Sequence, residues 1–267
     1  MNPWILFISG WFSIAMIMTI TFRFAWLRNN AGIVDVVWTY SIGILGIYYA
    51  LAGPLGFGIR QTVVLLLVLF WSIRLGAYLW IRIANEEEDG RYKSLKNAWK
   101  DNLKKKLFIF FQMQAIADSL LSIAILIAIL NPSPFGSFTD YAGIAIALIA
   151  IIGESISDKQ LHSFRTKSEN KGKTCRNGLW RYSRHPNYFF EWLYWWSFPL
   201  LAYGSSSWML ALISPIALLY LILKVTGIPP TEAQAILKRG DDYKSYQKET
   251  SAFFPWFYKN TTQPPKT

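Results

Sequence analysis

Residues 177–192 read NGLWRYSRHPNYFFEW and stand at the start of an apolar segment that runs to about residue 203. This stretch is dense in polar side chains: Arg181, Arg184, His185, Asn187, Tyr188 and Glu191. Ionisable groups are costly beside lipid, where they mostly face protein or water and mark ligand sites. The stretch therefore predicts a site for an anionic ligand where a membrane-spanning segment begins.

Seven apolar blocks are each about long enough to cross the roughly 30 Å hydrocarbon core of a bilayer as a helix. They lie near residues 3–22, 33–53, 61–82, 107–130, 139–158, 187–203 and 207–225. Hydrophobic residues make up 53% of the 267 residues and charged residues only 16%, against about 25% charged residues in soluble domains. We therefore expect an all-α polytopic membrane protein with seven transmembrane helices, in which residues 1–267 form a single integral membrane domain.

The basic residues predict the orientation of these helices. No basic residue precedes the first block, and Arg23 and Arg28 follow it, which indicates a retained span with an outside N-terminus. With that start, the segments expected inside and the inner end of the third block hold 25 of the 27 Lys and Arg residues. Such an asymmetry sets the orientation of membrane proteins. The C-terminus is therefore expected in the cytoplasm, and the net charge of +11 indicates membrane lipids as partners and no nucleic acid.

Five ionisable residues fall within the apolar blocks or at their ends. Asp35 lies near the inner end of the second block, Arg74 in the third and Asp118 in the fourth. Glu154 and Asp158 are four residues apart and share one face of the fifth. Because a charge against lipid is costly, we expect these side chains to face the bundle interior and to pair. A purely structural pairing, for example of Arg74 with Asp118 or Asp35, is the alternative to a role in ligand binding.

The spacing patterns of common metal and nucleotide sites do not occur. His162 and His185 are the only histidines, Cys175 is the only cysteine, and no CxxC, HExxH or HxxxH spacing exists. The glycine-rich dinucleotide fingerprint and the phosphate-loop pattern are also missing from the sequence. No metal, Rossmann fold or P-loop is therefore expected.

The residue types narrow the choice of anionic ligand. A dinucleotide phosphate needs cationic forks, hydrogen-bond partners for its ribose and some aromatic surface. Asn187 and Glu191 are four residues apart, so they share a helix face and point toward one pocket. The inner segments supply these cations: Arg91, Arg165, Arg181 and Arg184. S-adenosylmethionine has less need of arginines, so a pyridine dinucleotide is favoured.

Several segments resemble the C-terminal domain of the steroid 5-alpha-reductase superfamily, and more closely its bacterial branch of largely uncharacterised membrane proteins. They are GLWRYSRHPNYFFEW (178–192), ESISDKQLHSFRTK (154–167), GDDYKSYQKETSAFFPWF (240–257), AGIVDVVW (31–38), RLGAYLWIRI (74–83) and EDGRY (88–92). The resemblance implies an NADPH-dependent reductase of a C=C bond conjugated to a carbonyl. Its substrate would be lipid-soluble and steroid-like or isoprenoid-like, its location the bacterial inner membrane, and its cofactor-binding portion residues 150–259.

The resemblance also implies roles for single residues. The cofactor-binding residues it implies are Arg74, Arg91, Asp158, Arg165, Asn187 and Glu191, and the polar cluster adds Arg181, Arg184, His185 and Tyr188. The proton-donating tyrosine of the family falls near Trp71, which has no phenol to donate. Asp35 and Tyr78 are therefore the candidates for the catalytic acid.

Two other functions stay open at this point. The RHPxY element is shared with isoprenylcysteine carboxyl methyltransferases, which bind S-adenosylmethionine and carry a downstream Glu-Glu pair; here only Glu232 is found, within TEAQ. A membrane methyltransferase is therefore one alternative. Because Trp71 replaces the proton donor, a non-catalytic lipid-binding membrane protein is the other.

Overall fold

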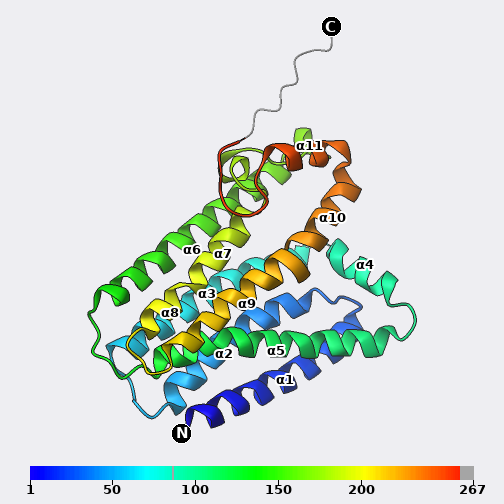
Figure 1. Ribbon diagram of the computed structural model, residues 1–267. Coiled ribbons are helices and arrows are strands. Elements are labelled where there is room, and N and C mark those ends of the chain that lie inside the picture. The colour runs from blue at the N-terminus through cyan, green and yellow to red at the C-terminus, as the bar shows by residue number, and fades with distance from the viewer. Residues whose placement is uncertain (86, 259–267) are drawn as a thin grey trace. The chain divides into compact units, whose positions relative to one another are not determined.

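The computed structural model describes residues 1–85 and 87–258 (Figure 1). This described part contains helices and no strand. Its α-helices are α1 (Pro3–Arg28), α2 (Ile33–Ala52), α3 (Ile59–Asn85), α4 (Gly90–Ala98), α5 (Leu103–Ile129), α6 (Phe138–Arg165), α7 (Pro186–Trp195), α8 (Ser197–Ala202), α9 (Ile213–Tyr220), α10 (Ile228–Arg239) and α11 (Asp241–Glu249). Short 3-10 turns η1 (Ser168–Asn170), η2 (Gly178–Arg181) and η3 (Trp208–Leu212) and a π-helix η4 (Leu221–Val225) join them. Residue 259, the last of the predicted cofactor-binding portion, lies outside the described residues.

Six helical segments in this part of the chain are long and apolar enough to cross a membrane. They are α1, α2, α3, α5, α6 and the continuous segment Trp208–Arg239. Each contains one of the predicted blocks to within a residue, and together they indicate an integral membrane protein. The predicted sides of the two termini stay predictions.

Several of these helices extend beyond the apolar blocks that predicted them, among them α1 and α6. α1 continues to Arg28 and α6 to Arg165, so residues 23–28 are not a loop and Arg165 lies on a helix. A basic residue in the last helical turn interacts favourably with the C-terminal end of the helix dipole. Polar residues therefore end the hydrophobic pattern of α1 and α6, while both helices continue through them. Asn29, with φ of 49°, finally stops α1 by turning its backbone N–H to Ala25 and Trp26.

The sixth predicted span, residues 187–203, consists of two short helices, α7 and α8, and is not among the six candidate spans. Pro199 supplies the physical reason for the break. Its ring nitrogen has no hydrogen to donate to the carbonyl four residues back, that of Trp195, where α7 ends. Trp196 keeps right-handed helical dihedrals, φ −70° and ψ −18°. The count of seven spans is thus not confirmed.

The chain divides into two compact units. Unit 1 consists of Met1–Ile144 and Trp196–Ala217, and unit 2 of Ala145–Trp195 and Leu218–Thr267. The division falls within α6 and α9, so each of these helices contributes residues to both units. The prediction of one integral membrane domain stays a prediction.

In unit 1, α1, α2, α3 and α5 pack against one another (Figure 1). α2 and α3 approach closely because α2 carries glycines at the contact. A Cβ on Gly43 would lie 2.6 Å from Ser72 Oγ, and one on Gly46 would lie 2.9 Å from Val68 Cγ1. Small residues at such positions let membrane helices pack without side chains holding them apart.

Buried charges in unit 1 have two different environments. Arg60 and Asp140 are buried and form an ion pair, and Arg60 also donates to the carbonyl of Leu201 at 2.7 Å. Asp118 on α5 is fully buried, yet neither carboxylate oxygen has a hydrogen-bond partner among the described residues. The expected pairing is therefore wrong for Asp118, because no cation reaches it.

In unit 2, the chain between α6 and α7 is tied to its neighbours by hydrogen bonds. Trp180 donates its indole N–H to the carbonyl of Ser157 at 2.9 Å, and Tyr246 of α11 donates to the carbonyl of Ser183 at 3.2 Å. Gly153 of α6 faces Phe190 of α7, and a Cβ there would lie 2.4 Å from the ring. These contacts fix the start of α7, which carries the polar cluster.

Candidate functional site

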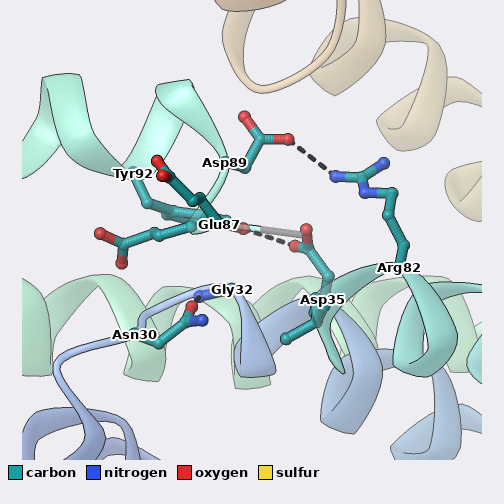
Figure 2. Close-up of a pocket in the computed structure, with 9 residues that line it drawn as sticks. Asn30, Gly32, Asp35, Arg82, Glu87, Asp89 and Tyr92 are labelled. Atoms are coloured by element: carbon teal, nitrogen blue, oxygen red, sulfur yellow. Dashed lines mark hydrogen bonds and ion pairs between the residues drawn. The ribbon is translucent and has the colours of Figure 1, made fainter. Parts of the chain in front are cut away.

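A recess in unit 1 is lined by Asp35, Arg82, Asp89 and Tyr92 among others, as Figure 2 shows. Asp35 is in the first turn of α2, and its Oδ1 accepts a hydrogen bond from the Tyr92 hydroxyl at 2.5 Å. Arg91 Nη2 lies 3.3 Å from Asp35 Oδ2. Asp89, the N-cap of α4, accepts from Arg91 and, at 2.7 Å, from Arg82 at the end of α3. The recess is therefore a charge network that docks α4 onto α2 and α3.

The charges of this network act on its titratable groups. Burial alone would raise the pKa of Asp89, but the Arg91 and Arg82 guanidinium groups outweigh it and hold that pKa below its ordinary value. Burial, and then the adjacent Asp35 carboxylate, raise the pKa of Tyr92 well above its ordinary value. Tyr92 thus keeps its proton over the physiological pH range.

The recess is small in this conformation. Its volume is about 30 Å³, and roughly 10–15 Å³ of such volume holds one water molecule. Ligand pockets for drug-sized molecules measure about 300–1,000 Å³. The recess is therefore large enough for a single polar group but not for a dinucleotide.

Arg74 and Tyr78, the other predicted site residues of unit 1, lie on α3. They are four residues apart, so they share one helix face, and both are half-buried. Their predicted roles in cofactor binding and proton donation stay predictions.

In unit 2, the structure brings Asp158 and Asn187 together. Asp158 is buried on α6, and its Oδ1 lies 3.4 Å from Nδ2 of Asn187, in the first turn of α7. Oδ1 of Asn187 is buried without a hydrogen-bond partner in the described part of the chain. One turn further along α7, Glu191 accepts a hydrogen bond from the Trp195 indole at 2.9 Å. Asn187 therefore has an unpaired hydrogen-bond acceptor beside the carboxylate of Asp158.

Arg184 and His185 are engaged within unit 2 by Glu232 of α10. Arg184 Nε lies 2.7 Å and His185 Nε2 lies 3.2 Å from the same oxygen, Glu232 Oε1. Gln247 donates to the other carboxylate oxygen at 2.6 Å. Arg184 also donates to the carbonyls of Gln247 and Thr250, at 3.0 and 2.6 Å. Its donors are largely occupied, so its contacts in this structure are with the protein itself.

His185 is buried in this cluster, with its ring stacked on Tyr188 at 5.3 Å and an interplanar angle of 5°. Burial lowers the pKa of His185, and the hydrogen bond that its ring makes to Glu232, which acts in the opposite direction, does not restore it. Tyr188 lies 3.2 Å from the Thr231 hydroxyl. The two residues hold α7 to the start of α10.

Arg165 and Arg181, in contrast, are exposed. Arg181 lies over the ring of Tyr258 with 5.4 Å to its centroid. Neither arginine forms an ion pair with a described residue. Of the predicted cofactor-binding arginines in unit 2, these two have guanidinium groups that an anion can reach.

The sequence analysis assigned no site role to three residues that the structure places in the two clusters: Asp89, Tyr92 and Glu232. Tyr92 and Asp89 lie in the EDGRY segment, where an aspartate followed by glycine marks the helix N-cap that Asp89 forms. Glu232 was noted only as a downstream acid, and nothing in the sequence pairs it with residues 47 and 48 positions earlier. No group of three or more metal-ligating side chains occurs among the described residues.

The chain belongs to the family described as "Protein of unknown function (DUF1295)", whose pattern matches residues 21–250. The match covers α2 to α11 and includes both clusters described above. No curated protein and no solved structure matches the chain.

Proposed function

We propose that the protein is a membrane-embedded NADPH-dependent reductase of a carbon–carbon double bond conjugated to a carbonyl. The similarity of its motifs to the steroid 5-alpha-reductase superfamily supports this class, with a lipid-soluble steroid-like or isoprenoid-like substrate and a bacterial inner membrane as location. The observation that carries the proposal is Asn187, whose Oδ1 is buried without a hydrogen-bond partner among the described residues. An unpaired buried acceptor costs about 1–3 kcal/mol, and a ligand N–H or O–H removes this cost.

The residues of unit 2 fit a pyridine dinucleotide in their chemistry. NADPH held there would supply the hydride for the β-carbon of the substrate. The amide N–H of Asn187 points to Asp158, with 3.4 Å between Nδ2 and Oδ1, so the unpaired amide oxygen is the atom of this side chain that a ligand donor would bind. Arg165 and Arg181 are exposed, and a guanidinium fork binds phosphate oxygens through two parallel hydrogen bonds.

Addition of one hydride and one proton across the double bond gives the saturated ketone. A side chain would supply that proton. Asp35 accepts hydrogen bonds from both Tyr92 and Arg91, which is the arrangement of an acceptor. We assign proton donation to the Tyr92 phenol, with Asp35 as the residue that orients it, and Tyr78 as the second candidate. The half-buried network limits access of bulk water to this proton.

Turnover of purified protein tests this proposal. Detergent-purified enzyme is mixed with NADPH and a panel of steroid-like and isoprenoid-like enones, and loss of NADPH absorbance is recorded. Tyr92→Phe removes the donor and keeps the ring, so kcat should fall by about 10²–10⁴-fold with unchanged NADPH affinity. Tyr141→Phe removes the hydroxyl of an exposed tyrosine of unit 1 and should change nothing. If none of the enones supports NADPH oxidation, the proposal is wrong.

A methyltransferase is the second candidate, and Glu232 is the observation that favours it. This carboxylate contacts both the arginine and the histidine of the RHPNY element, so the element and a downstream acid act together. Transfer of a labelled methyl group from S-adenosylmethionine to a prenyl thiol or lipid substrate would establish this reaction and replace the first.

A further inference from the structure

The α1–α5 groove is a second concave site in unit 1. Its lining residues are Phe22, Asn102, Lys104, Lys105 and Phe108, and its volume is about 390 Å³. It lies between the C-terminal part of α1 and the start of α5, which pack against each other. Gln112 of α5 lies 3.1 Å from Thr19 of α1, while Phe108 is against Phe22. The two helices therefore run antiparallel here, and the groove opens where both leave their apolar blocks.

The floor of the groove is aromatic. The ring of Phe22 meets Phe108 edge-on at 5.3 Å and Phe111 at 5.8 Å. Phe22 and Phe111 are buried, but 36% of Phe108 is exposed. Since these rings belong to helices that are candidate membrane spans, the floor offers an apolar surface at the depth where acyl chains begin.

The rim of the groove is cationic. Lys104 and Lys105 are exposed and form no ion pair with any described residue. The Lys104 ammonium group lies over the Trp26 ring, 6.0 Å from its centroid. Basic residues on the neighbouring α4 differ: Lys96 lies 2.7 Å from Glu88 and Lys93 lies 2.5 Å from Glu87. The two groove lysines thus keep their charge uncompensated by protein.

Polar groups without partners in the described chain complete the rim. Asn102 has a left-handed backbone, φ of 67°, and its side chain does not cap α5. The first N–H groups of α5 therefore have no side-chain acceptor, and such groups favour an anion. An anionic head and an apolar tail match the rim and the floor together.

We propose that the α1–α5 groove binds an anionic phospholipid, with its phosphate at Lys104, Lys105 and Asn102 and its acyl chain against Phe22 and Phe108. Basic pockets between membrane helices bind such headgroups, while zwitterionic lipids lack the net charge. Lysine stems lie along apolar surface with the ammonium group at headgroup level, which suits both lysines here.

Native mass spectrometry of the full chain, titrated in detergent with phosphatidylglycerol or phosphatidylcholine, tests this site. The wild-type protein should bind phosphatidylglycerol more tightly. Each lysine near an anionic headgroup contributes about fivefold, so K104Q/K105Q should weaken phosphatidylglycerol binding by about 25-fold. K167Q/K171Q removes the same charge from exposed lysines of unit 2 and should change it less than twofold.

The same titration separates the proposal from general charge effects. An equal loss in both double variants, or no loss in K104Q/K105Q, would overturn it. Displacement of the lipid by excess inorganic phosphate would overturn it too, because the site would then bind a free anion. Phe108→Ala, with melting temperature measured in parallel, should lower affinity for both lipids alike, and an unchanged affinity would contradict the acyl-chain contact.

Discussion

Asp118 is the residue whose surroundings differ most from those expected of a buried charge. It is fully buried on a membrane helix, and neither carboxylate oxygen has a partner among the described residues. By comparison, Arg60 has Asp140 and several carbonyls around it. A buried carboxylate without a partner is destabilising.

We expect Asp118→Asn to raise the stability of the protein. The amide has nearly the same size and cannot carry a charge, so the free energy of unfolding should rise by about 1 kcal/mol or more. Thermal unfolding in detergent at neutral pH measures the change. A clear fall in melting temperature would show that the carboxylate has a stabilising partner after all.

His185 makes a pH-dependent contribution. Its pKa is lowered in the folded protein by burial, against the effect of Glu232 and with the help of the Arg184 and Arg239 charges. The unfolded state then binds more protons, so stability rises with pH. The contribution is complete above the unfolded histidine pKa of about 6.5 and is lost as pH falls below it.

Melting temperatures of wild type and His185→Gln between pH 8 and pH 5 measure this contribution. The wild-type protein should lose more stability on acidification than the variant. His162→Gln, at an exposed histidine of α6, is the matched control and should follow the wild type. Identical profiles for wild type and His185→Gln would contradict the assignment.

At the scale of elements, hydropathy located the long spans but not the places where polar residues continue them. The block at 139–158 appears as the first two-thirds of α6, and Arg165 was expected in a loop. Hydropathy could not show that the sixth block would be split, because it counts apolar side chains and not backbone donors; the break follows from Pro199 itself. The π-helix η4 had no signal in that pattern either.

The number of spans can be measured through the two termini. Seven spans place the N- and C-termini on opposite sides of the membrane, and six place them on the same side. With Cys175→Ser as background, single cysteines introduced at Asn2 and Thr267 should differ in labelling by a membrane-impermeant maleimide on intact cells. We expect Asn2→Cys alone to be labelled; labelling of both or neither would remove α7–α8 as a span.

The contacts of the candidate site residues could be predicted from the sequence to different extents, for a physical reason. Asn187 and Glu191 follow from helix periodicity, and Asp158 from its motif. The contacts of Arg184 and His185 with Glu232 depend on long-range packing of α10, which no local pattern encodes. Tyr92 entered the site because α4 docks on α2 through Asp35, a contact between residues 57 positions apart.

At the scale of the whole molecule, the central proposal is that this integral membrane protein binds NADPH through Asn187 and its neighbours. Each unit contains a polar cluster. The proposal rests on the cluster of unit 2, where the amide oxygen of Asn187 has no hydrogen-bond partner among the described residues. Asn187→Ala removes this acceptor without touching Arg184 or His185. Asn97→Ala, at an exposed asparagine of α4, is its control.

The most direct test is calorimetric titration of the detergent-purified protein with NADPH and, separately, with S-adenosylmethionine. We expect micromolar binding of NADPH and no binding of S-adenosylmethionine. The affinity for NADPH should be about tenfold or more weaker in Asn187→Ala and unchanged in Asn97→Ala. Binding of S-adenosylmethionine alone, or of neither compound, would contradict the proposal.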